Sequence, residues 1–273
     1  MNKETITKLF TQFLNTYNQQ KSSETWQAQS NIFQKFWKEK IFDDQTELSI
    51  PDDLIPIVQI LDIKGAGKKE SEQRFEGVAY TNVYQNTWYK IFSALKKDKE
   101  KKNLVNDIFN AEIEEDLISL LDGLFELNKV NRIPALIGNN AIVINVFLFA
   151  YNPKDNISMV SLADRYNLID FFNLGDSTTI INLSYGNKIV RSRDLVLSFK
   201  EKYQMDIDNR GISCFFYYDP MKEIWKTGKG FTQMEKEEIS LLLNKLQIIL
   251  YGPPGTGKTY KTKSISIELI ESD

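Results

Sequence analysis

The sequence contains no histidine and only one cysteine among its 273 residues. The lack of histidine excludes a Ser–His–Asp triad, a Cys–His pair, an HExxH zinc helix and an HNH-type nuclease, because each needs an imidazole. A single cysteine excludes an intramolecular disulfide and a cysteine-cluster metal site. We interpret Cys214, in the apolar stretch 212–218, as a small buried residue, and we expect a reducing, cytoplasmic location.

A long apolar stretch is also missing. The longest one, residues 141–151, is interrupted by Asn145 and is far shorter than the ~20 residues that span a bilayer. The N-terminal segment is polar and amphipathic, without the apolar region and small-residue cleavage site of a signal peptide. We therefore expect that the protein has no membrane partner.

Positive charge is not in excess, since 34 Lys and Arg stand against 37 Asp and Glu, for a net charge of −3. A DNA contact would need a local basic patch, where lysines displace counterions from phosphates. The alternative for such lysines is a solvated connection between helices. Trp88, Tyr89 and Tyr217 could stack on a base, although packing in the core is the simpler interpretation. The DNA-contact candidates are Lys64, Lys68, Lys69, Lys96, Lys97 and Trp88.

Composition and periodicity predict a mainly helical protein. Apolar residues make up 42% and charged residues 26% of the chain, which is typical of globular proteins. Apolar positions recur at three- and four-residue spacings in many segments, and Ser161 followed by Asp164 has the spacing of a helix cap. We predict helices over residues 1–48, 54–61, 78–95, 104–127, 161–174 and 188–203, a strand over 212–218, and either a buried strand or a buried helix over 141–151.

The character of the sequence changes near residue 230, where we place a domain boundary. Residues 1–230 are expected to form a mainly α (α+β) domain that recognises a target. After it, Thr232 and Glu235 have the spacing of a capping box, and residues 248–251 form a short apolar strand. A glycine-rich turn follows this strand directly.

That turn, GPPGTGKT, matches the phosphate-binding loop GxxxxGK[ST]. Its glycines let successive backbone N–H groups converge on phosphate oxygens, and Lys258 places a positive charge near the β- and γ-phosphates. The Thr259 hydroxyl can ligate Mg²⁺, and the helix predicted over 259–270 directs its N-terminus at the phosphates. We predict a site for Mg²⁺ with GTP or ATP at Gly252, Pro253, Pro254, Gly255, Thr256, Gly257, Lys258, Thr259 and Tyr260.

The segment IILYGPPGTGKTYKTKSI, residues 248–265, resembles the start of the AAA+ domain in McrB-type motor subunits of modification-dependent (type IV) restriction systems. Tyr251 and Tyr260 flank the loop as in those sequences, while GPPGTGKT itself is shared by very many AAA+ proteins. A looser resemblance covers residues 1–230, in LDIKGAG (61–67), the stretch 85–92 and residues 145–175.

This resemblance implies that residues 231–273 are the first strand, phosphate-binding loop and helix of a truncated α/β AAA+ P-loop NTPase domain. In the family the N-terminal region reads DNA, the motor assembles into homo-oligomeric rings and hydrolyses GTP (ATP in other branches), and a separate nuclease subunit cuts. The chain would then be the DNA-recognition and nucleotide-binding part of a restriction or phage-defence NTPase. The alternative is an AAA+ remodelling NTPase whose N-domain binds protein.

Only 14 residues follow Thr259. The Walker B acid and the later motor motifs need further strands and are absent. We therefore expect a fragment or truncated product that does not hydrolyse nucleotide at a useful rate on its own.

A less favoured interpretation is a PD-(D/E)xK-like nuclease, because Asp52 is followed by Asp62 and Lys64 at a suitable spacing. In such enzymes the carboxylates hold Mg²⁺ while the lysine assists attack by water. The helical spacing of residues 54–61 argues against two acids on adjacent strands. The simpler alternative is a helix N-terminus with favourable acids and a solvated lysine beyond its C-terminal end.

Overall fold

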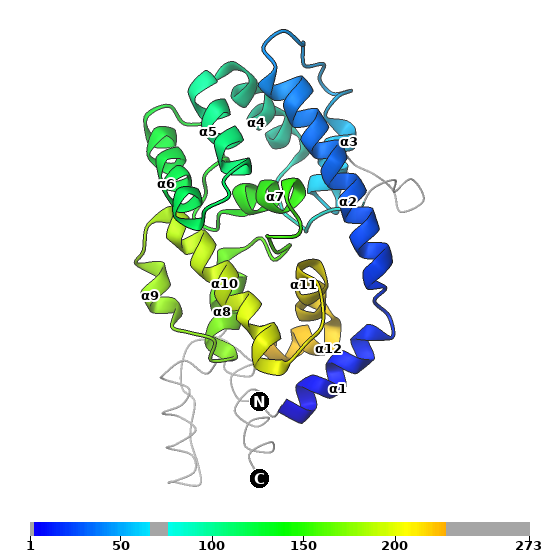
Figure 1. Cartoon of the computed structure of the whole chain (residues 1–273). Helices are drawn as coiled ribbons and strands as arrows, with labels where there is room; N and C mark the ends of the chain where they lie inside the picture. The colour runs from blue at the N-terminus through cyan, green and yellow to red at the C-terminus, as the bar shows by residue number, and fades with distance from the viewer. Residues whose placement is uncertain (1–2, 66–75, 228–273) are drawn as a thin grey trace, which may run out of the picture. The chain divides into compact units, whose positions relative to one another are not determined.

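The computed structural model of the chain describes residues 3–65 and 76–227. The chain divides into two units, Met1–Met221 and Lys222–Asp273. The first is a helical domain (Figure 1). The second contributes only residues 222–227 to the described part, including the π-helix η4 (Glu223–Thr227). The capping box at Thr232 and the strand, loop and helix predicted at 248–270 lie outside the described residues.

The helical domain is built from twelve α-helices and one π-helix within its described residues. In chain order they are α1 (Lys3–Leu14), α2 (Gln19–Phe36), η1 (Trp37–Phe42), α3 (Ile55–Leu61), α4 (Gln85–Lys97), α5 (Lys99–Phe109), α6 (Glu114–Val130), α7 (Ile142–Tyr151), α8 (Leu162–Phe171), α9 (Ser177–Ile181), α10 (Tyr185–Tyr203), α11 (Asn209–Tyr217) and α12 (Asp219–Lys222). None of the described helices is both long and apolar enough to cross a membrane.

Helix α7 is apolar on every side, and its residues 143–150 are all buried. It packs against α2 and α3 in the interior of the domain (Figure 1). A helix satisfies its own backbone groups, so it can be buried without a strand partner. Its one polar interior residue, Asn145, donates its side-chain amide to the carbonyl of Val160 at 2.8 Å. Of the two predictions for residues 141–151, a buried strand or a buried helix, the helix is confirmed.

Helix α10 packs against both α6 and α8. Its contact with α6 is close: a Cβ on Gly186 would lie 2.3 Å from the carbonyl oxygen of Ile118. The Gly186 N–H also donates to Asp122 of α6 at 2.7 Å. Only glycine permits this approach, and it holds together two of the elements that form the site described below.

Several helix predictions are confirmed. The predicted helical region 1–48 contains α1, α2 and η1, and α3 and α10 match the predictions for 54–61 and 188–203 closely. Ser161 caps α8 by accepting a hydrogen bond from the Asp164 N–H at 3.4 Å. Helix α8 nevertheless ends at Phe171, before the predicted end at 174.

Three predictions need correction. The predicted strand 212–218 is instead helical over 212–217, as part of α11, whose N-terminus is capped by Asp208. The predicted helix 104–127 is interrupted between Phe109 and Glu114. Residues 78–84 are not helical, because Val78 N–H donates to Ile60 and Ile63 N–H donates to Ala79. These hydrogen bonds hold the chain beside the end of α3, and α4 starts only at Gln85.

No strand is present in the ranges 3–65 and 76–227, where an isolated parallel bridge joins Asp62 and Ala79. The fold of this part is therefore mainly α, and the α+β alternative finds no sheet within it.

Candidate functional site

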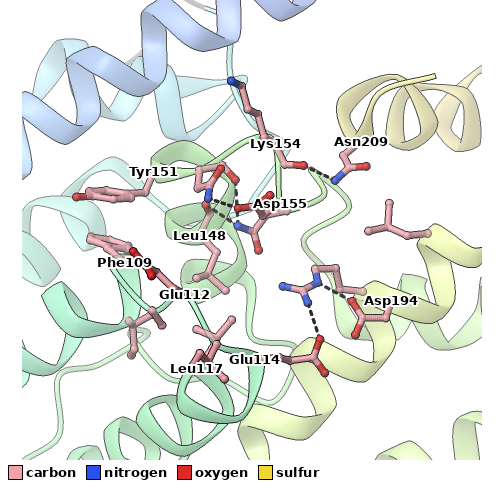
Figure 2. A pocket seen from close by; sticks show the side chains of 17 residues that line it. Phe109, Glu112, Glu114, Leu117, Leu148, Tyr151, Lys154, Asp155, Asp194 and Asn209 are labelled. Carbon is pink, nitrogen blue, oxygen red and sulfur yellow. Dashed lines mark hydrogen bonds and ion pairs between the residues drawn. The ribbon is translucent and has the colours of Figure 1, made fainter. Parts of the chain in front are cut away.

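A cavity of about 420 Å³ opens between helices α5, α6, α7, α10 and α11 and the loops that join them (Figure 2). Its wall includes the link 110–113 between α5 and α6, the end of α7, the turn 152–156 and the middle of α10. Asn209, at the start of α11, completes the wall and donates its side-chain amide to the Lys154 carbonyl at 2.6 Å. A cavity of this size can hold a small organic molecule or a long side chain.

The lining of the cavity is mixed, with more polar than apolar exposed surface, and its apolar part is well anchored. The rings of Phe109 and Tyr151 stack with their centroids 4.2 Å apart and their planes 9° from parallel. Leu117 and Leu148 extend this surface from α6 and α7 (Figure 2). The carbonyl of Tyr151 accepts hydrogen bonds from two α2 side chains at 2.7 Å, which hold the end of α7 in place.

One wall carries a network of two acids and two arginines. Arg193 donates from Nε to Asp194 at 2.8 Å and from Nη2 to Glu114 at 3.4 Å. Arg191 lies 3.5 Å from the other oxygen of Glu114. Burial, and next the neighbouring carboxylate of Asp194, raise the pKa of Glu114, and the two arginines oppose the rise without cancelling it.

The sign of this pKa shift has a consequence for stability. A raised pKa means that folding favours the protonated form of Glu114. The stability that this group contributes is present below its unfolded pKa and is lost as the pH rises through its folded value. The wall thus pairs two carboxylates with two guanidinium groups, so its formal charges balance.

The rim of the cavity adds further carboxylates. Glu112 in the link and Asp155 in the turn are both exposed. Asp155 accepts a hydrogen bond from the Asn152 side chain, whereas Glu112 has no hydrogen-bond or ion-pair partner within the described ranges. Lys154 directs its ammonium group away from Glu112 and Asp194 (Figure 2). The uncompensated charge of the cavity is therefore negative.

The predicted nucleotide site, Gly252 to Tyr260 with Thr259 as the Mg²⁺ ligand, lies outside the described residues, as do Lys68 and Lys69. It stays a prediction. Within the described part, no group of three or more Cys, Asp or Glu residues is placed to hold a metal ion.

The lysine-rich run 96–102 does not form the free basic patch that its sequence suggests. Lys101 and Lys102 are only 1% and 2% exposed and pair with Asp98 and Asp44. Lys96 donates to the Asp43 carbonyl, and burial, with the nearby charge of Lys102, lowers its pKa. Lys97 is exposed and is the one DNA-contact candidate from this run that stays free for such a role.

The aromatic candidates for base stacking agree better with the alternative of packing in the core, and Trp88 is corrected as a DNA contact. Trp88 is fully buried and packs on Phe147, so no base can reach its ring in this conformation. Tyr217 donates its hydroxyl to Asp164, and burial raises the pKa of that hydroxyl. Tyr89 is half-buried beside Gln85. All three rings contribute to packing.

The nuclease arrangement does not form. Asp52 precedes α3 and is exposed, whereas Asp62 follows α3 and is buried. Seven helical residues separate the two carboxylates, a length of about 10 Å at 1.5 Å per residue. Asp62 instead accepts hydrogen bonds from the Lys64 N–H at 2.8 Å and from the Thr81 hydroxyl, and so joins α3 to residues 79–81.

Cys214 is half-buried and has no disulfide. Burial raises the pKa of its thiol, so the thiolate form is disfavoured. This placement agrees with the interpretation of Cys214 as an unreactive packing residue, although its burial is incomplete.

The structure also shows candidates that sequence reasoning missed. Tyr80 and Tyr84 are 64% and 84% exposed, and their segment is hydrogen-bonded beside the chain that carries the exposed Lys64. No periodicity marks these two tyrosines as exposed. The cavity residues come from segments far apart in the chain, and no local motif could have grouped them.

Comparisons of the chain with protein-family models, with curated proteins and with solved structures found no match.

Proposed function

We propose that this chain is the DNA-recognition and nucleotide-binding part of an AAA+ NTPase subunit of a restriction or phage-defence system. A separate subunit would carry the nuclease, and the complete motor would form a homo-oligomeric ring that uses Mg²⁺ with GTP or ATP. The observation that carries the proposal is the sequence GPPGTGKT at 252–259, which follows an apolar segment and precedes a helical pattern.

If residues 252–260 form a nucleotide site, fluorescent GTP or ATP analogues should bind the full chain in the presence of Mg²⁺. Lys258→Ala should weaken binding at least about tenfold, because the lysine charge faces the β- and γ-phosphates. Lys263→Ala removes an equal charge beyond the loop and serves as the matched control. Equal affinities for the wild type and Lys258→Ala, measured by anisotropy, would count against a phosphate-binding loop.

For DNA recognition, the described residues offer Lys64 with Tyr80 and Tyr84. Exposed aromatic rings can stack on bases, and a neighbouring lysine can contact the backbone phosphates. These residues lie on two backbone segments joined by the hydrogen bond from Ile63 N–H to Ala79 O, at 3.0 Å. They therefore support a DNA contact better than the run 96–102 does.

This arrangement predicts salt-dependent binding of the full chain to short duplexes, with or without cytosine methylation. The logarithm of the binding constant should fall with a slope of about −0.9 per neutralised phosphate between ~50 and ~200 mM salt. Lys64→Ala should reduce that slope by about one, while Lys129→Ala, exposed on α6, should not. A slope near zero, or no binding at low salt, would argue against DNA as the target.

A second candidate function is protein recognition by the helical domain. The specific observation in its favour is the cavity, whose uncompensated negative charge would repel a phosphate backbone. Protein binding should depend weakly on salt compared with DNA binding, so the same titration separates the two candidates.

A further inference from the structure

We propose that the cavity between the α5–α6 link, the end of α7 and α10 binds an aliphatic cation. The ligand is an ammonium or guanidinium group on a hydrocarbon chain, carried either by a lysine or arginine side chain of a peptide or by a free amine. This site is independent of the nucleotide and DNA contacts proposed above.

The size and the lining of the cavity suit such a ligand. The cavity of about 420 Å³ has room for a four- or five-carbon chain with its terminal group. The stacked Phe109 and Tyr151 rings, with Leu117 and Leu148, present apolar surface to such a chain. Long cationic side chains bury their methylene groups against this kind of surface while the charged end stays at a polar edge.

The charged side chains that line the cavity are mostly acidic. Glu114 and Asp194 share one guanidinium group, that of Arg193, and Arg191 approaches Glu114 from the exposed side at 3.5 Å. Glu112 and Asp155 add two carboxylates at the rim. A bound cation would lie within reach of several acids and beside the apolar part of the lining, where an ionic hydrogen bond is stronger than in open solvent.

The charges of the cavity disfavour an anionic ligand. Both cationic side chains that line the cavity are unsuited to an anion: Arg193 already donates to two carboxylates, and Lys154 points away. A phosphate or carboxylate would meet Glu112 and Asp155 at the rim without a free partner. The cavity therefore selects for positive charge.

The test is calorimetric titration of the full chain with cadaverine, agmatine and the peptide acetyl-Gly-Lys-Gly-amide, with 1-pentanol and glutarate as neutral and anionic analogues. The double variant Glu112→Gln/Asp155→Asn removes both rim charges. Glu115→Gln removes one exposed charge near the site without touching its lining and is the control for folding and for loss of a nearby acid. Thermal unfolding of each variant verifies that the domain is intact.

We expect the cations to bind and the two analogues not to. The double variant should bind the cations about fivefold more weakly, as expected for two exposed ionic contacts, while Glu115→Gln matches the wild type. Tighter binding of the peptide than of the amines would assign the ligand to a protein partner, and the reverse would assign it to a free amine. Cation binding that is unchanged in the double variant, equal binding of glutarate, or no cation binding at ~10 mM, where even weak contacts become visible, would overturn the proposal.

Discussion

Phe147→Ala is expected to lower the free energy of unfolding by about 3–5 kcal/mol, the range for removing a fully buried aromatic side chain. Phe147 lies in the middle of α7 and is fully buried. Its ring contacts four others, those of Phe33, Trp88, Phe92 and Phe109. These rings belong to α2, α4 and α5, so the cavity left by alanine would lie between helices that cannot all move inward.

Urea titration followed by tryptophan fluorescence measures this effect. Phe147→Leu keeps most of the side-chain volume, so it should lower the free energy of unfolding by less than half as much as Phe147→Ala. Val130→Ala, at an exposed position at the end of α6, should change the unfolding free energy by no more than about 0.5 kcal/mol. If Phe147→Ala were as mild as Val130→Ala, the central position of α7 would be wrong. The Phe109 ring packs on Phe147 and also lines the cavity. Phe147→Ala should therefore also weaken the binding of a ligand in the cavity.

Asp98→Ala is expected to cost about 3–5 kcal/mol, because it leaves the buried ammonium group of Lys101 without its partner. Lys101 Nζ lies 2.6 Å from Asp98 and is shielded from solvent. Asp98 also caps α5 by accepting a hydrogen bond from the Lys101 backbone N–H at 3.1 Å. The substitution therefore removes an ion pair and a helix cap together.

Two further variants separate these contributions. Asp98→Asn can keep the cap but loses the charge, so its free energy of unfolding should lie between those of the wild type and Asp98→Ala. Asp98→Ala combined with Lys101→Met removes the buried charge as well. Its free energy of unfolding should be roughly 2 kcal/mol higher than that of Asp98→Ala. If the double variant were no more stable than Asp98→Ala, the ion pair between Asp98 and Lys101 would not account for the loss of stability.

The same pair gives a pH dependence. Burial by itself would raise the pKa of Asp98, but the hydrogen bonds from Lys101 and its positive charge lower it more, so the pKa lies below its ordinary value of 3.8. Stability from this group is therefore present above the unfolded pKa and is lost as the pH falls through the folded pKa. Wild-type protein should lose this contribution on acidification, and Asp98→Asn should not.

Local patterns in the sequence predicted much of the helical content. The apolar spacing in residues 1–48 and 188–203 and the Ser161 cap are confirmed, because short-range periodicity and capping act within a single helix. The interruption at 110–113 was missed, since the apolar spacing continues across it and only the packing of α5 against α6 requires a turn there. The phosphate-binding loop predicted at 252–259 is likewise a local pattern of eight consecutive residues, and it stays a prediction because it lies outside the described residues.

The tertiary structure decided the features that depend on distant partners. Residues 212–218 are aromatic and β-branched enough for a strand, yet the Asp208 cap and packing of α11 against α2 and α10 make them helical. Lys96 and Lys102 look like a basic surface until Asp43 and Asp44 are brought to them by folding, whereas Lys101 pairs locally with Asp98. The cavity exists only where the α5–α6 link, α7, α10 and α11 meet. Helix formation is governed by neighbours along the chain, whereas burial, ion pairing and cavities are governed by residues that only folding brings together.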